Sequence, residues 1–126
     1  MESTNRPQQS VEAYEAAMDQ AGGRQSLVER FGEVVVKLSQ PLETGSRALT
    51  ELRLDFLGLT GLDMEIIDDQ IGAMGLRGML PAYSRKYQRM LAARAAGVEE
   101  SLLLKLPLAD YNAVTGAAQN FLLVSG

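Results

Sequence analysis

Residues 33–56 have the sequence EVVVKLSQPLETGSRALTELRLDF, and this stretch decides the fold that we predict for the chain. Apolar residues recur at every second position in both halves of it: Val34, Val36 and Leu38, then Leu52, Leu54 and Phe56. A period of two is typical of a half-buried strand. The segment QPLETGSR between the halves holds a proline and a glycine, so we predict a β-hairpin with a long loop. A lone hairpin is marginally stable in water, and we therefore expect the helices that follow to cover its apolar face.

Composition limits what the chain can be. It has 126 residues, of which 46% are hydrophobic and 22% charged, as expected of a single globular domain. The chain has no cysteine and no histidine, which removes the thiol nucleophile, the imidazole base and the commonest metal ligands. The serines therefore have no histidine to activate them. We predict a protein that is not an enzyme and that binds no cofactor or metal.

The remainder of the chain predicts helices, and the fold class that we expect is α+β: an N-terminal hairpin at about residues 33–56 packed with three to four short helices. Residues 1–30 are predicted as a polar, partly disordered arm with one short helix, VEAYEAAMDQA, and residues 31–126 as the folded domain. Further helices are expected from Thr60 to about Gly72, over residues 82–96, over residues 98–104 and from Pro107 onward. Their predicted buried faces are Leu62, Ile66, Ile67 and Ile71; Tyr83, Tyr87, Met90, Leu91 and Ala95; and Leu108, Tyr111, Val114, Ala118, Phe121 and Leu122.

Two features could suggest chemistry, and both have a simpler interpretation. Asp63, Glu65, Asp68 and Asp69 crowd one predicted helix, but no calcium-loop pattern surrounds them. We interpret them as a solvated acidic face. The segment Gly72–Gly78 lacks the lysine and hydroxyl of a phosphate-binding loop, and it follows a helix rather than a strand. We predict a flexible connector there, able to act as a hinge.

The basic helix is the strongest candidate for a binding surface. Residues 77–126 hold six basic and three acidic side chains, whereas residues 1–76 hold six basic and thirteen acidic side chains. Five of the basic residues fall between positions 77 and 94 with no acid among them: Arg77, Arg85, Lys86, Arg89 and Arg94. Three interpretations remain open: a solvated face, a surface for a protein partner, or a nucleic-acid contact. The acidic chain as a whole disfavours nucleic acid, because non-specific binding to phosphates depends mainly on charge.

The order of several motifs is similar to that in tail assembly chaperones of long-tailed bacteriophages, the Mu-like contractile-tail group. The first strand matches at Val36, Leu38, Pro41 and Leu42, and the second at Leu49, Thr50, Glu51, Leu52 and Leu54. The C-terminal part matches at Gly97-Val98, Leu103, Leu106-Pro107, Asp110-Tyr111 and Phe121-Leu122. The similarity covers about residues 33–124. The family's arginine and proline after the second strand are missing here, where Asp55-Phe56-Leu57-Gly58-Leu59-Thr60 keeps only the threonine, and the first 30 residues look like an extension.

The resemblance implies a non-enzymatic role in tail morphogenesis. Such chaperones bind the long, helical tape measure protein in the host cell cytoplasm, keep it soluble until the tail tube protein polymerises around it, and are absent from the mature virion. A ribosomal frameshift often produces a longer form with the same N-terminal portion. We expect this client and these partners here, with self-association left open. No membrane is expected as a partner, because no apolar run approaches the 20 or so residues that span a bilayer. The alternatives are a structural tail or adaptor protein retained in the virion and, less favoured, a nucleic-acid-binding regulator that uses helix 83–96.

A helical client would be held in a groove. We predict that the C-terminal helices and the Gly72–Gly78 hinge form or gate it. The candidate partner-binding residues are Tyr83, Tyr87 and Met90 for apolar contact and Arg85, Lys86 and Arg89 on the rim. Met90 also fits a position in the core.

Overall fold

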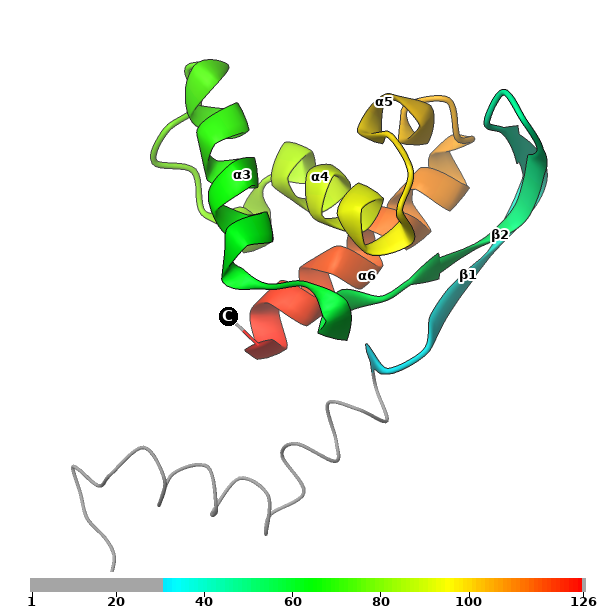
Figure 1. Cartoon of the computed structure of the whole chain (residues 1–126), viewed down its shortest axis with the longest axis horizontal. Helices are drawn as coiled ribbons and strands as arrows, with labels where there is room; N and C mark the ends of the chain where they lie inside the picture. The colour runs from blue at the N-terminus through cyan, green and yellow to red at the C-terminus, as the bar shows by residue number, and fades with distance from the viewer. Residues whose placement is uncertain (1–30, 126) are drawn as a thin grey trace, which may run out of the picture.

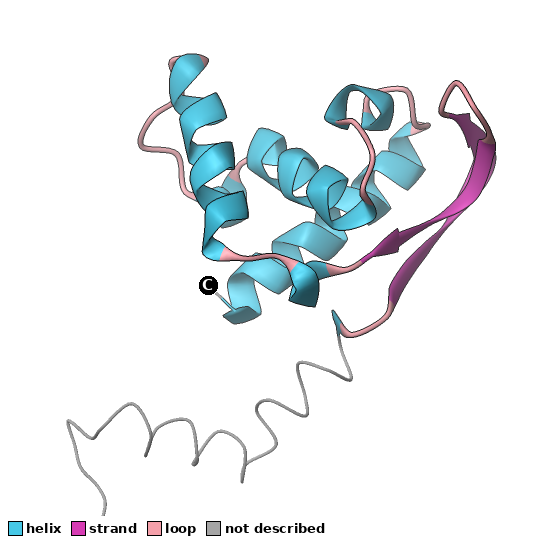
Figure 2. Ribbon diagram, viewed as in Figure 1, coloured by secondary structure: helices cyan, strands magenta, loops and turns pink. Residues whose placement is uncertain are grey.

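The computed structural model describes residues 31–125, and Figure 1 shows the order and placement of their elements. A two-stranded antiparallel hairpin is followed by α-helices and short 3-10 helices, so the predicted α+β fold class is confirmed. Figure 2 shows the hairpin curving along one end of the helical cluster. The predicted arm and its short helix lie outside the described residues.

The first strand is longer and the loop is shorter than the sequence predicted, while the second strand ends at Leu54, two residues before the predicted end at Phe56. Strand β1 spans Val34–Glu43 and β2 spans Ala48–Leu54. The predicted loop at QPLETGSR is wrong in its first half, because β1 continues through Pro41. A register shift between Lys37 and Leu42 accommodates this proline, which has no N–H to donate to a ladder. The loop itself closes at Thr44, whose backbone N–H and hydroxyl both donate to the Arg47 carbonyl at 2.9 Å.

The hairpin has an apolar inner side and a charged outer side, as the alternation predicted. Leu52 and Leu54 are buried opposite Val36 and Val34. On the outer side Lys37 lies opposite Glu51, with 3.5 Å between their charged atoms. Such surface ion pairs contribute at most about 1 kcal/mol each. The hairpin is therefore stabilised mainly by what covers its apolar side.

Helices supply that cover. Their bounds are Phe56–Gly58 for η1, Gly61–Ala73 for α3, Pro81–Tyr83 for η2, Arg85–Ala96 for α4, Glu100–Leu103 for α5 and Leu108–Ser125 for α6. Helix α4 lies at the centre, where it packs against β2, α3, α5 and α6, while α6 also packs against β1 (Figure 1). Ala92 at its middle is completely buried, and its small side chain permits this close packing.

Helix boundaries follow capping residues. Helix α3 starts after Thr60, as expected from the sequence, and Thr60 and Asp63 form a capping box there. The predicted start of the basic helix at residue 82 is wrong by three residues. The Ser84 hydroxyl accepts a hydrogen bond from the Tyr87 N–H and so begins α4 at Arg85. Gly97 ends α4 in the left-handed conformation with φ of 70°.

The three phenylalanines of the chain meet in one cluster. Phe56 and Phe121 stack with ring centroids 5.0 Å apart, and Phe31 approaches Phe121 edge-on at 5.2 Å. Both arrangements are favourable for aromatic rings. The cluster joins the start of the hairpin, its end and the C-terminal part of α6.

Three residues predicted to be buried are exposed: Leu62, Tyr83 and Leu108, with exposed fractions of 66%, 70% and 72%. Tyr83 lies in η2, and the change from a 3-10 to an α-helix breaks the periodicity on which its prediction depended. Leu62 and Leu108 lie in the first turns of α3 and α6, at the edge of the core. The other predicted apolar faces are buried or half-buried.

Candidate functional site

Three of the six predicted partner-binding residues are not on the surface. Tyr87, Arg89 and Met90 are only 2%, 7% and 3% exposed. Tyr87 and Met90 belong to the hydrophobic core, and the Tyr87 hydroxyl donates a hydrogen bond to the Asp68 carboxylate of α3. Burial and this carboxylate raise the pKa of Tyr87. For these three residues the prediction of a partner surface is wrong, because they face neighbouring helices.

Arg89 connects three helices instead of binding a partner. Its Nε lies 2.7 Å from the Glu100 carboxylate of α5, and its Nη1 donates to the Tyr111 hydroxyl of α6 at 3.4 Å. Burial alone would lower the pKa of Arg89, but Glu100 and Tyr111 outweigh it and raise the pKa. The charge is satisfied within the fold. A local sequence window cannot reveal this, because Glu100 is 11 positions further along the chain.

The remaining basic residues of α4 differ in their surroundings. Arg94 pairs with Asp63 of α3 at 2.7 Å. Arg85 donates to the Asn112 side chain and lies over the Tyr111 ring at 6.0 Å. Arg85 and Lys86 are both exposed. Among the basic residues of this helix, the two that form no ion pair within residues 31–125 thus lie in its first turn, near Tyr83.

The acidic face of α3 is only partly solvated. The Asp63 carboxylate accepts from the Thr60 N–H at 2.8 Å and from Arg94, and these bonds lower its pKa. Asp68 contacts Tyr87, while Glu65 and Asp69 are exposed. The prediction of a solvated face is thus wrong for Asp63, which is half-buried and paired, whereas Asp68 is exposed and also accepts the Tyr87 hydroxyl. Within residues 31–125, no group of three or more acidic side chains is placed to hold a metal ion.

The predicted hinge at Gly72–Gly78 forms a compact turn in this structure. Leu76 donates its backbone N–H to the Ile71 carbonyl at 3.1 Å, and Gly75 and Gly78 have φ angles of 78° and 87°. The Arg77 guanidinium lies against Gly72, where an added Cβ would come within 2.9 Å of Arg77 Cζ. Whether the segment acts as a hinge remains a prediction.

The best candidate for a binding surface is an apolar groove between α3, η2 and the C-terminal end of α6. We call it the α3–α6 groove; its volume is about 390 Å³, and it is lined by Met64, Leu80, Pro81, Ala82, Tyr83, Leu122 and Leu123. Leu80, Tyr83 and Leu123 have exposed fractions of 67%, 70% and 52%. These are large apolar side chains that the described part of the fold leaves uncovered. Such a surface is typical of a site for a partner.

Hydrogen bonds anchor the η2 side of this groove. The Ala82 carbonyl accepts one hydrogen bond from Gln88 Nε2 of α4 at 2.8 Å and another from Gln119 Nε2 of α6 at 3.0 Å. Gln88 is only 5% exposed, so its side-chain amide is shielded from water and bonds to this carbonyl instead. These two bonds fix η2 to both helices. Tyr83, although exposed, therefore projects from a backbone that is well anchored.

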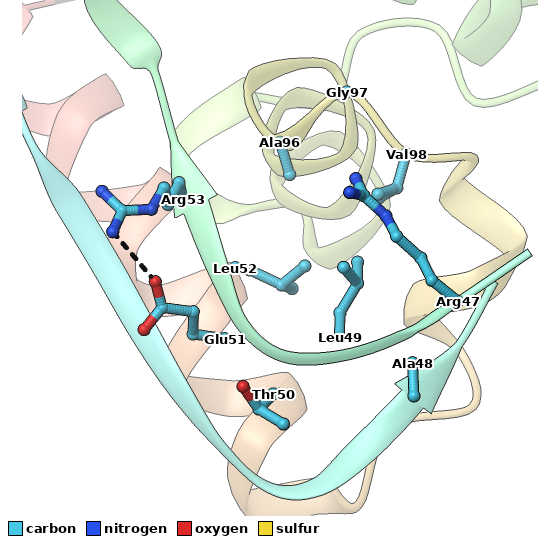
Figure 3. Close-up of a pocket in the computed structure, with 10 residues that line it drawn as sticks. All are labelled: Arg47, Ala48, Leu49, Thr50, Glu51, Leu52, Arg53, Ala96, Gly97 and Val98. Atoms are coloured by element: carbon cyan, nitrogen blue, oxygen red, sulfur yellow. Dashed lines mark ion pairs between the residues drawn. The ribbon is translucent and has the colours of Figure 1, made fainter.

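Two other cavities are more polar. The larger, of about 520 Å³, follows the edge of β2 from Arg47 to Arg53 and the turn at Ala96–Val98. Figure 3 shows Leu49 and Leu52 between the strand and this turn, with Arg47 extending toward Val98. A third, of about 490 Å³, lies among Gln70, Arg94 and the start of α5. Neither presents large exposed apolar side chains of the kind found in the α3–α6 groove.

Sequence reasoning largely missed the groove, since it singled out only Tyr83 among the lining residues for binding. Leu80 lies in a segment rich in glycine and proline, and Leu123 follows the predicted buried face of the last helix. Their one detectable signal is the presence of large apolar residues in places where neither helical nor strand periodicity requires them.

Comparison with known proteins adds no further constraint. No family model, no curated protein and no solved structure matches this chain. Among residues 31–125, no helix combines the length and the apolar character needed to cross a membrane.

Proposed function

We propose that this chain is a non-enzymatic tail assembly chaperone, which binds the tape measure protein of a long-tailed phage and keeps it soluble in the host cell cytoplasm. The observation that carries the proposal is the α3–α6 groove, in which Leu80, Tyr83 and Leu123 are exposed on an anchored backbone. A long helical client offers apolar residues at i, i+3, i+4 and i+7, and a groove of this kind accommodates them.

The residues that carry the resemblance support the proposal because they have structural roles. Leu42, Leu52 and Leu54 are buried on the hairpin, and Leu106 is buried before α6. These positions are therefore ones at which an apolar residue is required by the fold of this chain. The family to which they are similar consists of chaperones.

Charge beside the groove suggests the character of the client segment. Arg85 and Lys86 are exposed directly after η2, whereas Arg89 and Arg94 are paired with carboxylates. We expect the client helix to carry acidic residues next to its apolar stripe. The same pairing weakens the nucleic-acid alternative, because two of the four basic residues of α4 are already paired with carboxylates and so contribute less to binding phosphates.

The test is co-expression with a tape measure protein from the same genome, with the soluble fraction of the client as the measurement. The double variant Leu80→Ser/Tyr83→Ser should lose most of the solubilising effect. Its matched control is Leu104→Ser/Leu108→Ser, which alters residues 58% and 72% exposed. Leu108 lies about 22 Å from Leu123 along α6, so the control leaves the groove intact.

Circular dichroism and urea unfolding should show that both variants keep the fold, because the altered side chains are exposed. If the client is equally insoluble with and without the wild-type chain, the chaperone function is wrong. If the groove variant works as well as the wild type, the client binds elsewhere. Finding the chain in purified virions would instead favour the structural tail protein.

A further inference from the structure

The described part of the chain begins beside the α3–α6 groove. Phe31 is 5% exposed and its ring contacts that of Phe121, with 5.2 Å between their centroids. The next residue of α6, Leu122, lines the groove. The polypeptide that precedes Phe31 is therefore tethered close to the wall of an open apolar surface.

The preceding sequence contains a segment suited to that surface. In residues 11–21, VEAYEAAMDQA, the residues Val11, Tyr14, Met18 and Ala21 are spaced by three, four and three positions. This spacing places them on one side of a helix. Ser10 can cap such a helix at its start, and Gly22 can end it. The segment has the apolar stripe that a groove between helices would bind.

The tether is long enough. Residues 22–30 separate the segment from Phe31, and nine residues span at most about 30 Å when extended. A helix of eleven residues is about 17 Å long. Because Phe31 contacts Phe121, the neighbour of the groove residue Leu122, a tether of this length can bring the segment to the groove without any change in residues 31–125.

Charges on the two surfaces are complementary. The segment carries Glu12, Glu15 and Asp19 and no basic residue. Arg85 and Lys86 are exposed at the first turn of α4, directly after the groove residue Tyr83. Covalent linkage also gives a segment of the same chain an effective concentration in the millimolar range, which favours it over a second copy.

We propose that residues 11–21 dock in the α3–α6 groove of their own chain, with Tyr14 and Met18 against Leu80, Tyr83 and Leu123. The docking itself requires no client. Its consequence, competition between this segment and the tape measure protein, rests on the proposed function. If the docked state is populated at about 90%, client affinity falls about tenfold.

Paramagnetic relaxation tests the docking directly in the full chain. The chain has no cysteine, so Gln20→Cys provides a single site for a nitroxide label. Gln20 lies on the side of the expected helix opposite Tyr14 and Met18. Oxidised label should broaden the backbone amide signals of Leu80, Ala82 and Leu123 and leave that of Leu108 sharp.

A double substitution in the stripe provides the sharpest comparison. Tyr14→Ser/Met18→Ser should abolish the broadening, whereas the control Ala13→Ser/Ala16→Ser, on the opposite side, should retain it. Equally strong broadening of the groove signals of isotope-labelled, cysteine-free chains, when these are mixed with spin-labelled chains that carry no isotope, would assign the groove to a second copy and overturn the proposal. Absence of broadening in the groove would overturn it as well.

The client experiment separates this proposal from the proposed function. If the segment docks, Tyr14→Ser/Met18→Ser should raise client affinity several-fold relative to the wild type. If the chain shows broadening but binds no tape measure protein, the docking proposal stands and the chaperone function is wrong. If the chain solubilises the client but shows no broadening, the chaperone function stands and the docking proposal is wrong.

Discussion

Asp110 joins the two halves of the fold by accepting two hydrogen bonds from Ser39. The Ser39 backbone N–H donates to its carboxylate at 3.0 Å, and the Ser39 hydroxyl donates at 2.8 Å. Ser39 lies where the register of β1 shifts, and Asp110 lies in the first turn of α6. The carboxylate thus satisfies a strand N–H within the irregular part of the ladder, and its charge favours the N-terminus of the helix.

Asp110→Ala should therefore lower the free energy of unfolding by about 1–3 kcal/mol, since Asp110 is 7% exposed and its loss leaves the Ser39 N–H without this acceptor. Urea unfolding measures the effect. Glu65→Ala, at an exposed position of α3, is the control and should change stability by less than about 0.5 kcal/mol. Equal stability of the two variants would show that the Ser39–Asp110 contact contributes nothing.

Arg89 and Lys86 should respond differently to substitution, because one is buried and paired and the other is exposed. Arg89→Ala should destabilise the fold by about 2 kcal/mol, less than for a fully buried pair because Glu100 is partly exposed. Lys86→Ala should leave stability within about 0.5 kcal/mol. Thermal and urea unfolding both test this. A stable Arg89→Ala variant would argue against the role of Arg89 in joining α4 to α5.

Asp63 should make the fold sensitive to acid. Hydrogen bonds from the Thr60 backbone and from Arg94 lower its pKa from the ordinary value of 3.8. The ionised carboxylate therefore stabilises the folded state above pH 3.8, and this contribution is lost as the pH falls through the lowered pKa. Unfolding of the wild type and of Asp63→Asn should differ at neutral pH and converge in acid.

Arg94→Met provides a second comparison for this pH effect, because it removes one of the two causes. Asp63→Asn should destabilise the Arg94→Met variant less than it destabilises the wild type. An undiminished loss would assign the whole effect to the Thr60 cap.

Two glycines should respond oppositely to alanine. Gly97 has φ of 70°, so Gly97→Ala should destabilise the fold by about 1 kcal/mol through backbone strain alone, as an added Cβ meets no atom within 4 Å. Gly116 lies within α6 and also has space for a Cβ. Gly116→Ala should stabilise the fold by about 0.5–1 kcal/mol. Thermal unfolding distinguishes the two, and a stabilising Gly97→Ala would contradict the left-handed cap.

The sequence predicted the elements well and the surfaces poorly. Local rules located the hairpin, the Thr60 cap and the stop at Gly97, since each depends on residues within one or two turns of the chain. The same rules extended the hairpin loop over Pro41, because a register shift depends on the partner strand and cannot be seen in one strand alone.

By itself, the sequence determined the α+β class, the start of α3 at Thr60, the end of α4 at Gly97 and the apolar side of the hairpin, because periodicity and capping act over a few residues. Only the tertiary structure decided which charged residues are bonded to other residues of the fold and which apolar residues are exposed to solvent. Arg89 meets Glu100, and Asp110 meets Ser39, across separations that no local pattern spans. Leu80 and Tyr83 are exposed in a segment that Gln88 and Gln119, from two different helices, hold by hydrogen bonds to the Ala82 carbonyl. A binding surface is a property of residues that are distant in sequence, and it exists only once the chain has brought them together.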